Sequence, residues 1–413
     1  MRSDAAIDGG RVLADLDELH ALTGDERGAQ RLAWTEPWAA ARRWLIGRLE
    51  QLPVDVERDE AGNLWALLRG REEETVLVGG HLDSVPDGGR LDGSLNVVAG
   101  LEVLRAVAAG GRPRRSLALV DWADEEGARF GRSLLGSGLA CGVVEPGEVA
   151  ALTDADGVTL AAAMARQGVD LSAAPRARRR LEPVVAALEL HIEQGPVLER
   201  AGVALGAVTG TLGITRSEAT IRGRSAHAGG TPFELRRDAA LAGVRLAAAA
   251  HDAALARRGL ATIASLATRP RVGWVVQEGC ELRLDQRHGE AETLRELHAD
   301  VRAAADRIAA EQQVSISWRP LDHFEPVAFD PALIDLLERN ARAVAGSCER
   351  LPSGPLHDSW QLARSGIPTG MLFVQSVDGI SHHRDEATRP DHVELAVETL
   401  ARSVGELLAA GRG

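Results

Sequence analysis

The chain has 413 residues, which is long enough to bury the cores of two domains of ordinary size. Hydrophobic residues make up 45% and charged residues 26%, as in globular proteins, and the formal net charge of -13 disfavours nucleic-acid binding. The sequence contains no lysine and no tyrosine. Without lysine it cannot form a Schiff base, anchor pyridoxal phosphate or build a P-loop. Any chemistry must therefore come from His, Asp, Glu, Ser, Cys, Arg or a metal.

The cysteines and the N-terminal residues indicate the compartment. Cys141, Cys280 and Cys348 are scattered and lie outside any metal-binding spacing, which favours a reducing environment. The N-terminal segment is acidic and has no apolar core of the kind found in secretory signals. No run of about 20 apolar residues follows it. We therefore expect a cytoplasmic protein that binds neither a membrane nor nucleic acid.

The N-terminal part of the chain is expected to be helical and then extended. Helix-like periodicity covers residues 11–50, with a break at Thr23–Gly24. Trp34, Trp38 and Trp44 recur at near-helical spacing, which favours core packing over a ligand cage. Two short strands are expected at residues 54–58 and 64–68, separated by a turn.

Four buried strand-like runs each lead to residues that can bind a metal. The runs are Thr75–Val78, Arg115–Asp121, Val184–Leu190 and Thr369–Val374, and they lead to His81 with Asp83, Glu125 with Glu126, His191, and His382 with His383. Asp92 lies just before a helix expected from Asn96 to Ala109. Strands that alternate with helices predict a mostly parallel α/β sheet, whose ligands bind beyond the carboxyl ends of the strands. Asp83 lies on the same side of an extended chain as His81 and could accept the second N–H of that ring. One His–Asp pair would equally suit a polar loop, whereas metal-binding residues at the ends of four separate strands favour a metal site.

The pattern changes between Leu205 and about Phe324. The expected order there is strand 214–222, helix 236–257, strands 261–267 and 280–287, helix 291–312 and strand 314–320. This β-α-β-β-α-β order is typical of a ferredoxin-like domain. We expect such a domain at residues 208–324, inserted into a catalytic domain formed by residues 1–207 and 325–413.

The polar residues at the strand ends suit metal-assisted hydrolysis. His81, Asp92, Glu126, His191 and His382 offer the nitrogen and oxygen ligands that Zn²⁺ or Mn²⁺ binds. Five such side chains are more than one open tetrahedral site needs, and a two-metal site bridged by Asp92 accounts for all of them. Glu125 can then stay free as the general base for a metal-activated water.

Six segments, in this order and spacing, resemble the M20-type metallohydrolases. They are GGHLDSVPDGGRLDG, WADEEGARFGRSLLGS, LHIEQGPVLE, SAHAGGTPFELRRDA, LDQRH and GISHHRDE. The branch they resemble contains N-carbamoyl-L-amino-acid amidohydrolases, allantoate amidohydrolases and β-ureidopropionases. The resemblance covers nearly the whole chain, but it does not fix the substrate.

The resemblance implies a site with two divalent metal ions, which can be Zn, Mn, Co or Ni. It assigns His81, Asp92 and His191 to one metal, Asp92, Glu126 and His382 to the other, and Glu125 to the general base. It implies that His227, in a lid and dimerisation domain, steadies the oxyanion across a homodimer. It also implies that Gln194, Arg216, Arg287 and His357 lie near a small carboxylate substrate.

Some assignments have alternatives. His383 could replace His382 as the ligand, and Arg216 or Arg287 could merely form ion pairs within the inserted domain. Trp274 stands where the branch usually has a substrate-binding Asn, and we expect it to favour a bulkier or more apolar substrate. Alternatively, Trp274 packs in the core of the inserted domain. The altered SGPLHD segment, which contains His357, leaves the local substrate contacts open.

The expected function is hydrolysis of a carbon–nitrogen bond other than a peptide bond. The leading substrate class is an N-carbamoyl (ureido) or related N-acyl amino acid. The alternatives within the same enzyme class are allantoate, or a plain N-acyl amino acid or dipeptide. The alternative from another class is an inactive binding protein that kept the fold.

Overall fold

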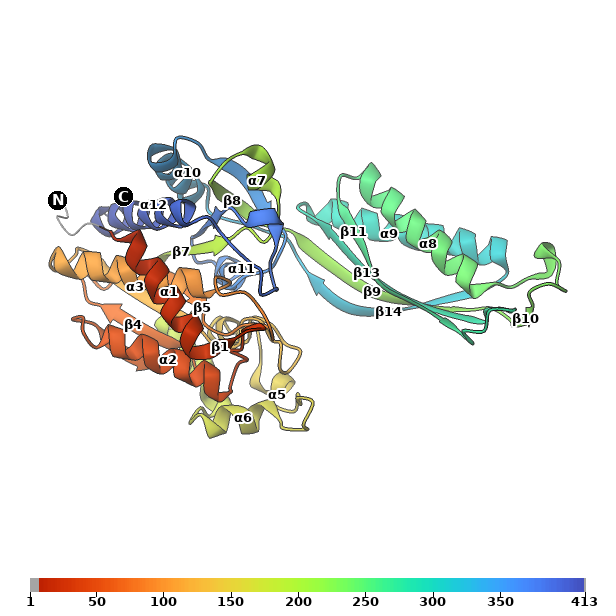
Figure 1. Cartoon of the computed structure of the whole chain (residues 1–413), viewed down its shortest axis with the longest axis horizontal. Coiled ribbons are helices and arrows are strands. Elements are labelled where there is room, and N and C mark those ends of the chain that lie inside the picture. Colours follow the sequence, from red (N-terminus) through yellow and green to blue (C-terminus); the bar gives the residue numbers. More distant parts are fainter. Residues whose placement is uncertain (1–6, 412–413) are drawn as a thin grey trace. The chain divides into compact units, whose positions relative to one another are not determined.

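The structure, a computed structural model, describes residues 7–411 and divides into two compact units. The first unit comprises the residues up to Thr209 together with those from Ala328 onward, and the second comprises Gly210–Val327. Each unit has a sheet and helices of its own (Figure 1).

The first unit is built on a nine-stranded mixed sheet, as counted over residues 7–411. Its central strands are β17 (Thr369–Val374), β7 (Val184–Ile192), β5 (Thr75–His81) and β6 (Ser116–Trp122), which pair in parallel in that order. The flanking strands are β4 (Leu64–Leu68), β3 (Asp55–Arg58), β8 (Leu205–Thr211), β15 (Val327–Ala328) and β16 (Glu349–Ser353). The predicted α/β class is confirmed, but the flanking pairs β17–β8, β4–β6 and β3–β4 are antiparallel. Of these pairs, β3–β4 is connected by a short turn that reverses the chain.

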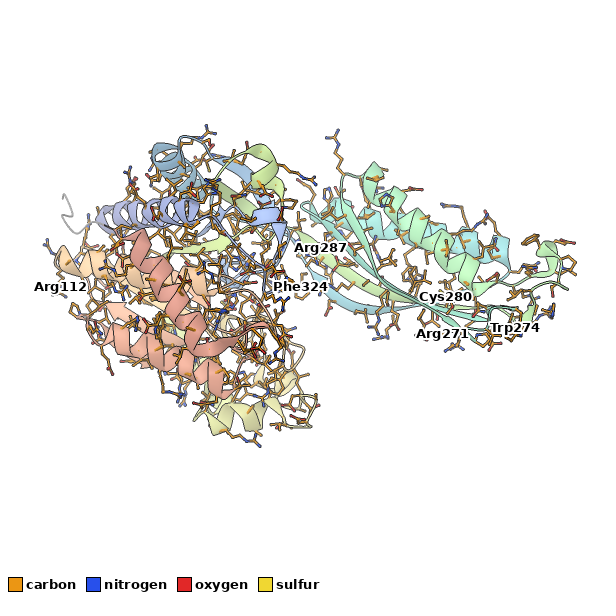
Figure 2. All side chains as sticks on the ribbon, in the orientation of Figure 1. Arg112, Arg271, Trp274, Cys280, Arg287 and Phe324 are labelled. Atoms are coloured by element: carbon orange, nitrogen blue, oxygen red, sulfur yellow. The ribbon has the colours of Figure 1, made fainter. Side chains whose placement is uncertain are left out.

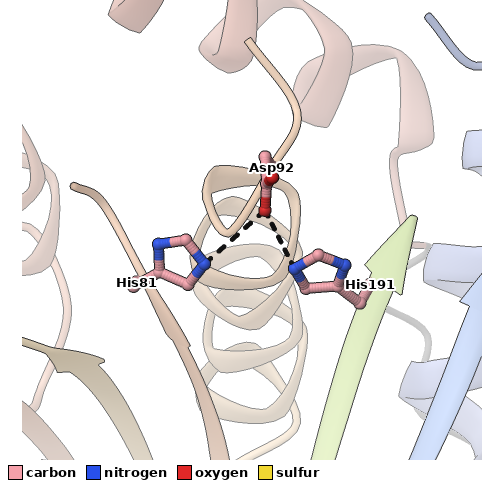
Figure 3. A group of neighbouring side chains, drawn as sticks. All are labelled: His81, Asp92 and His191. Atoms are coloured by element: carbon pink, nitrogen blue, oxygen red, sulfur yellow. Dashed lines mark ion pairs between the residues drawn. The ribbon is translucent and has the colours of Figure 1, made fainter. Parts of the chain in front are cut away.

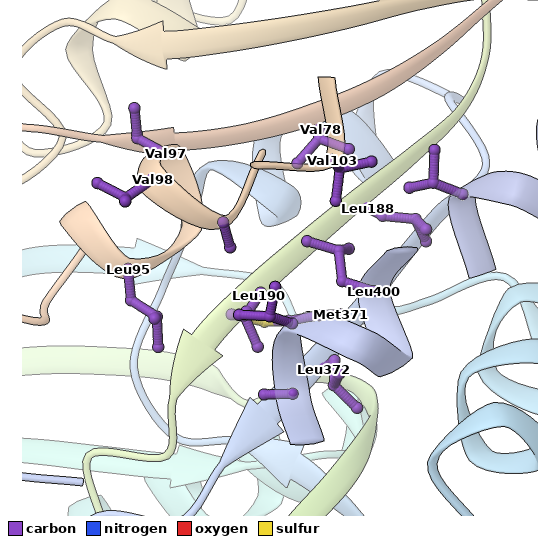
Figure 4. Packing of buried hydrophobic residues seen from close by; sticks show 14 of the residues in the cluster. Val78, Leu95, Val97, Val98, Val103, Leu188, Leu190, Met371, Leu372 and Leu400 are labelled. Carbon is purple, nitrogen blue, oxygen red and sulfur yellow. The ribbon is translucent and has the colours of Figure 1, made fainter. Parts of the chain in front are cut away.

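The central strands bury both of their faces, because their side chains alternate between two apolar clusters. Val76 and Val78 of β5 belong to one cluster and Leu77 to the other. The first cluster includes residues of α1 (Gly9–Thr23), α3 (Ser94–Ala109), α10 (Pro331–Ala345) and α12 (Pro390–Ala409). The second includes residues of α4 (Leu135–Ala140), α6 (Leu160–Arg166) and the 3₁₀ helix η1 (Leu171–Arg180). Figure 4 shows the first cluster, where Leu188 of β7 and Leu400 of α12 lie close together.

Shorter elements complete the first unit. They are β1 (Gly24–Asp25), β2 (Gly28–Ala29), α2 (Glu36–Leu49), α5 (Pro146–Val149), α7 (Val197–Ala201), α11 (Asp358–Arg364) and η3 (Val377–Gly379). Trp34, Trp38 and Trp44 are buried, which confirms that they serve core packing. The three cysteines are free, as their scattered positions predicted, and all three are buried.

The second unit contains a four-stranded antiparallel sheet in the order β11-β13-β9-β14. Along the chain its main elements are β9 (Gly213–Arg222), α8 (Ala239–Ala256), β11 (Leu260–Arg269), β13 (Gly279–His288), α9 (Ala291–Gln312) and β14 (Ser315–Phe324). The order is therefore β-α-β-β-α-β, with a separate two-stranded pair, β10 (Ala226–His227) and β12 (Val275–Val276), and the short helix η2 (Phe233–Leu235).

Helix α8 is long and apolar enough to cross a membrane by length and composition alone. Part of its surface is nevertheless buried, and Leu246 and Ala250 pack with Leu282 of β13 and Val301 of α9. Because these contacts are those of a core helix, the length and composition of α8 are not evidence for a membrane span.

Candidate metal centre

Four predicted ligand segments meet at one edge of the central sheet. His81 is the last residue of β5, His191 lies next to the end of β7, and Glu126 and His382 follow β6 and β17. Asp92 joins them from the loop before α3. The next residue, Gly93, has φ of +64°, and a Cβ there would lie 2.3 Å from the His81 ring. Glycine is therefore needed at this position for the loop to approach His81.

The first set of side chains, here called the His81 group, contains His81, Asp92 and His191, all buried. The Nε2 atoms of His191 and His81 lie 3.1 Å and 3.6 Å from Asp92 Oδ1, with the carboxylate between the two rings (Figure 3). His81 Nδ1 lies 3.0 Å from the carbonyl oxygen of Asp83, and His191 Nδ1 lies 2.9 Å from that of Ile192. Because a carbonyl only accepts hydrogen bonds, the neutral rings keep the proton on Nδ1 and present a lone pair on Nε2.

The second set, the His382 group, contains Asp92, Glu126 and His382. His382 Nε2 lies 3.2 Å from Asp92 Oδ2 and 3.5 Å from Glu126 Oε2. Asp92 therefore directs one carboxylate oxygen toward each group. The side chain of His383 is 56% exposed and its ring faces Asp385 instead. The structure thus brings His382, rather than His383, into the cluster.

Glu125 lies beside both groups without belonging to either. Its Oε2 atom is 3.7 Å from His81 Nε2. Burial raises the pKa of Glu125 well above its usual value, and the neighbouring carboxyl groups of Asp358 and Glu126 raise it further. A buried carboxyl group with a raised pKa beside the candidate ligands is suited to accept and donate protons.

Asp83 connects the end of β5 to the segment that carries both glutamates. Its carboxylate accepts hydrogen bonds from the backbone N–H groups of Glu125, at 3.2 Å, and Glu126, at 3.1 Å. We expected this carboxylate to accept the second N–H of His81, but His81 Nδ1 lies 3.8 Å from it and 3.0 Å from the Asp83 carbonyl oxygen. The carboxylate is engaged by the glutamate backbone, so the carbonyl orients His81.

Asp121 is a supporting residue to which the sequence alone assigned no role. Its carboxylate accepts a hydrogen bond from the backbone N–H of Leu82, at 2.8 Å. It also forms a buried ion pair with Arg42, whose Nε atom lies 2.6 Å away. It therefore anchors the chain just after His81 to the end of β6 and to helix α2. The sequence feature that could have indicated this role is the position of Asp121 at the end of a buried strand.

The two groups fit divalent cations. Glu126 Oε1 is buried and has no hydrogen-bond partner among residues 7–411. A buried carboxylate oxygen without a partner is costly unless a cation neutralises it. Burial would lower the pKa of His191, but its contact with Asp92 raises that pKa to about 9, which shows how strongly this carboxylate attracts positive charge. Nitrogen and oxygen donors without thiolates suit Zn²⁺ or Mn²⁺.

Gln194 lies at the metal centre. Its Nε2 atom donates hydrogen bonds to Asp92 Oδ2 and to Ser381 Oγ, each at 3.0 Å. Its φ of +57° places it in the left-handed region, an uncommon conformation for this residue type. The side chain is thus directed at the shared carboxylate.

His357 lies behind His191. The two ring centroids are 4.3 Å apart, and His357 Nε2 is 3.1 Å from Ser353 Oγ. Burial lowers the pKa of His357 well below its usual value, and nearby His191 lowers it further. His357 is therefore a buried neutral ring packed against a member of the His81 group.

In the second unit, Arg216 and Arg287 both pair with Asp285. Arg216 Nε lies 2.7 Å from Asp285 Oδ2, and Arg287 Nε lies 2.7 Å from Asp285 Oδ1. Burial would lower the pKa of Arg216, but contact with Asp285 raises it. The ion pairs that we considered as an alternative are therefore present, and they hold both guanidinium groups in place.

His227 and Trp274 lie beside each other in the second unit. His227 pairs with Val275 in the β10–β12 ladder, and the Trp274 carbonyl accepts the N–H of Ala228 at 3.0 Å. The Trp274 residue is 71% exposed, so the alternative that it packs in the core is wrong. Figure 2 shows Arg287 at one end of the four-stranded sheet and Trp274 beyond the other end.

The tautomer of His227 is set by its own loop. The backbone N–H groups of Gly229 and Gly230 point at His227 Nδ1, at 3.2 Å and 3.0 Å. Because Nδ1 accepts these hydrogen bonds, the neutral ring carries its proton on Nε2. His227 therefore presents an N–H donor away from its loop.

Comparison with known proteins identifies the family. The model of peptidase family M20/M25/M40 matches residues 77–406, which is most of the chain. The chain belongs to this family. An N-carbamoyl-L-amino acid amidohydrolase of Geobacillus stearothermophilus is 36% identical over 92% of this chain and 93% of that protein. An allantoate amidohydrolase of Escherichia coli K12 is 33% identical over 92% and 93% of the two chains.

A solved structure agrees with these family relatives. The crystal structure of an amidase of the hydantoinase/carbamoylase family from Burkholderia multivorans matches with a TM-score of 0.91 and 32% identity. The match covers 98% of this chain and 99% of that one. The fold and the family assignment therefore agree.

Proposed function

We propose that this protein is a metal-dependent amidohydrolase that cleaves the carbon–nitrogen bond of an N-carbamoyl (ureido) or related N-acyl amino acid. The observation that carries the proposal is the pair of ligand groups that share Asp92, with Glu125 held beside them. Family relatives named as N-carbamoyl-L-amino acid amidohydrolases support the substrate class.

Two divalent cations, Zn²⁺, Mn²⁺, Co²⁺ or Ni²⁺, would be held by the His81 group and the His382 group. Such cations supply Lewis acidity, which lowers the pKa of a bound water from about 15.7 toward about 7. Glu125 is placed to accept a proton from the attacking water and to pass it to the leaving nitrogen when the carbon–nitrogen bond breaks. Asp83 holds Glu125 in position through the backbone hydrogen bond of 3.2 Å.

Other side chains bind the substrate in this proposal. His227 donates its Nε2–H to the oxyanion, as its tautomer allows. Arg216 and Arg287, aligned by Asp285, bind the substrate carboxylate, and Gln194 binds its amide. His357 supports His191 from behind, which is a less direct role than the substrate contact expected from the sequence.

The second unit supports a homodimer. Along β9 and β13, the pair Arg216–Asp285 and the pair Arg222–Gly279 are six residues apart, or about 20 Å at the rise of a strand. The β10–β12 pair that carries His227 joins the Gly279 end, through the bond from the Gly223 N–H to the Glu278 carbonyl. A small substrate cannot reach both ends of one sheet, so a complete site needs His227 of a second copy.

An exposed edge offers the surface for this pairing. Strand β11 is an edge strand of the four-stranded sheet, and its side chains Leu260, Ile263 and Leu266 are exposed. Helix α8 packs beside β11 and exposes Val244 and Leu255. A long apolar edge strand is a template for pairing with another copy.

Replacing Ile263 with lysine should therefore separate the dimer. Two like charges facing each other across the paired edges repel, so sedimentation equilibrium should show monomers at concentrations where the unaltered chain is dimeric. Hydrolysis should fall by about 10²–10³-fold, the loss expected when one oxyanion donor is removed. Ser317→Lys on β14, the opposite edge strand, is the matched control and should change neither property. An Ile263→Lys variant that stays dimeric would disprove this interface.

Trp274 is proposed to select the substrate side chain, because it presents an exposed indole beside His227. Replacing Trp274 with Asn should lower the preference for N-carbamoyl amino acids with large apolar side chains over allantoate by about tenfold. The measurement is the ratio of kcat/KM for the two substrates. An unchanged ratio would rule out a role for Trp274 in specificity.

A substrate panel tests the proposed activity. N-carbamoyl, N-formyl and N-acetyl amino acids and allantoate are assayed with Mn²⁺, Co²⁺ and Zn²⁺ in turn. Ammonia release from the carbamoyl compounds supports the leading assignment, and release of a carboxylic acid alone supports an N-acyl amino acid or dipeptide hydrolase. Fastest turnover of allantoate would favour the alternative suggested by the allantoate amidohydrolase of E. coli. Binding without turnover of any compound would indicate an inactive binding protein.

The remaining proposals concern location. Three free, buried cysteines fit a reducing compartment, and we propose that the protein is cytoplasmic. The net charge of -13 supports a small-molecule substrate rather than a nucleic acid.

A further inference from the structure

We propose that Glu386 is a positioning residue that fixes Asp92 between the two ligand groups. This inference rests on the proposed function, because it assumes that the groups bind divalent cations. It assigns a role to a carboxyl group that is in neither group.

Both oxygens of the Glu386 carboxylate are engaged. Oε1 accepts hydrogen bonds from the backbone N–H groups of Leu91, at 3.1 Å, and Asp92, at 3.0 Å. Oε2 accepts a hydrogen bond from the Ser381 hydroxyl at 3.1 Å. Glu386 itself is 5% exposed, so these hydrogen bonds are sheltered from competing water.

These contacts join two segments that supply ligands. Asp92 and Glu386 are 294 residues apart in the sequence, and Ser381 immediately precedes His382. The Ser381 hydroxyl also lies 3.4 Å from Asp92 Oδ2. One carboxylate therefore sets the backbone of the shared ligand and, through Ser381, its distance from the segment of His382.

The loop is shaped to admit the carboxylate. A Cβ atom at Gly89 would lie 2.0 Å from Glu386 Oε1 and 2.2 Å from its carboxyl carbon. The φ angle of Gly89 is not in the left-handed region, so backbone conformation does not require glycine at this position. The close approach of Glu386 does require it. The bend before Asp92 wraps around this side chain.

Replacing Glu386 with alanine tests the role through metal binding. The backbone at Asp92 loses its anchor, so affinity for Mn²⁺ should fall by about 10- to 100-fold, the loss typical when a group that hydrogen-bonds to a metal ligand is removed. The loss should be larger for the cation of the His382 group, because that segment is released as well. Calorimetric titration of the metal-free protein with Mn²⁺ alone measures both affinities without an activity assay.

Two further variants separate positioning from general stability. Glu386→Gln keeps an oxygen for the two N–H groups and an amide that can donate to Ser381, so it should keep Mn²⁺ affinity within about threefold. Asp154 is a matched control, because its Oδ1 also accepts two backbone N–H groups, from Asp156 and Val158, in a loop outside both ligand groups. Asp154→Ala should lower the melting temperature without changing Mn²⁺ affinity.

A folded Glu386→Ala variant that binds Mn²⁺ as tightly as the unaltered chain would overturn the inference. If Glu386→Ala does not fold, Gly89→Ala displaces the carboxylate instead, and unchanged Mn²⁺ affinity in that variant would overturn it equally. Failure of the proposed function is a separate result: the unaltered chain would bind Mn²⁺ but hydrolyse nothing in the substrate panel. An unaltered chain that binds no divalent cation would overturn both.

Discussion

Replacing Glu125 with glutamine should lower kcat by a factor of about 10²–10⁴ and leave the metal content unchanged. Glutamine keeps the size of the side chain but cannot accept the proton of the attacking water. Glu125 is in neither ligand group, and its Oε2 atom lies 3.7 Å from His81 Nε2. Metal analysis of the purified variant, together with steady-state kinetics, measures both quantities.

The result has a matched control in Glu193, a buried glutamate whose carboxylate accepts the backbone N–H groups of Val197 and Leu198. Glu193→Gln should keep kcat within a few-fold. Loss of metal from Glu125→Gln would instead make Glu125 a ligand. A kcat close to that of the unaltered protein would mean that another group accepts the proton.

Replacing Asp92 with asparagine should weaken both cations together. Its two carboxylate oxygens face different groups, with Oδ1 at 3.1 Å from His191 Nε2 and Oδ2 at 3.2 Å from His382 Nε2. Removing the charge should lower each affinity by about 100-fold or more, since even the loss of a group that only hydrogen-bonds to a ligand lowers metal affinity by about 10- to 100-fold. Activity should become undetectable at metal concentrations that saturate the unaltered protein.

His382→Asn provides the comparison for Asp92→Asn, because His382 belongs to one group and Asp92 to both. It should weaken one cation by a similar factor and leave the other nearly unchanged. Stepwise Mn²⁺ titration distinguishes the two patterns. If Asp92→Asn also weakened a single cation, Asp92 would not be a bridging ligand.

The ligand segments could be predicted because the sheet's central strands are buried on both faces. Continuous apolar runs such as Thr75–Val78 mark such strands, and polar residues just after them must lie at the edge of the sheet. The choice of His382 over His383 came from the family resemblance and could not be made from the strand pattern. It depends on the turn at His382, whose φ is +53°, and sequence periodicity does not report such a conformation.

The supporting contacts were harder to predict, because they join residues that are far apart in the sequence. Asp83 was expected to orient His81, yet its carboxylate binds the backbone of Glu125, 42 residues away. Asp285 reaches Arg216 because β9 and β13 pair in a register that places these residues opposite each other. Neither strand register nor loop path can be read from local composition.

The most direct test of the account is anomalous diffraction from crystals of the protein grown with Mn²⁺. A shared two-metal centre predicts two peaks per chain, each about 2.0–2.2 Å from ligand atoms of one group, with an Asp92 oxygen bound to each. The ligands of one peak should include His81 and His191, and those of the other Glu126 and His382. A single peak, or two peaks without Asp92 between them, would contradict the shared two-metal centre.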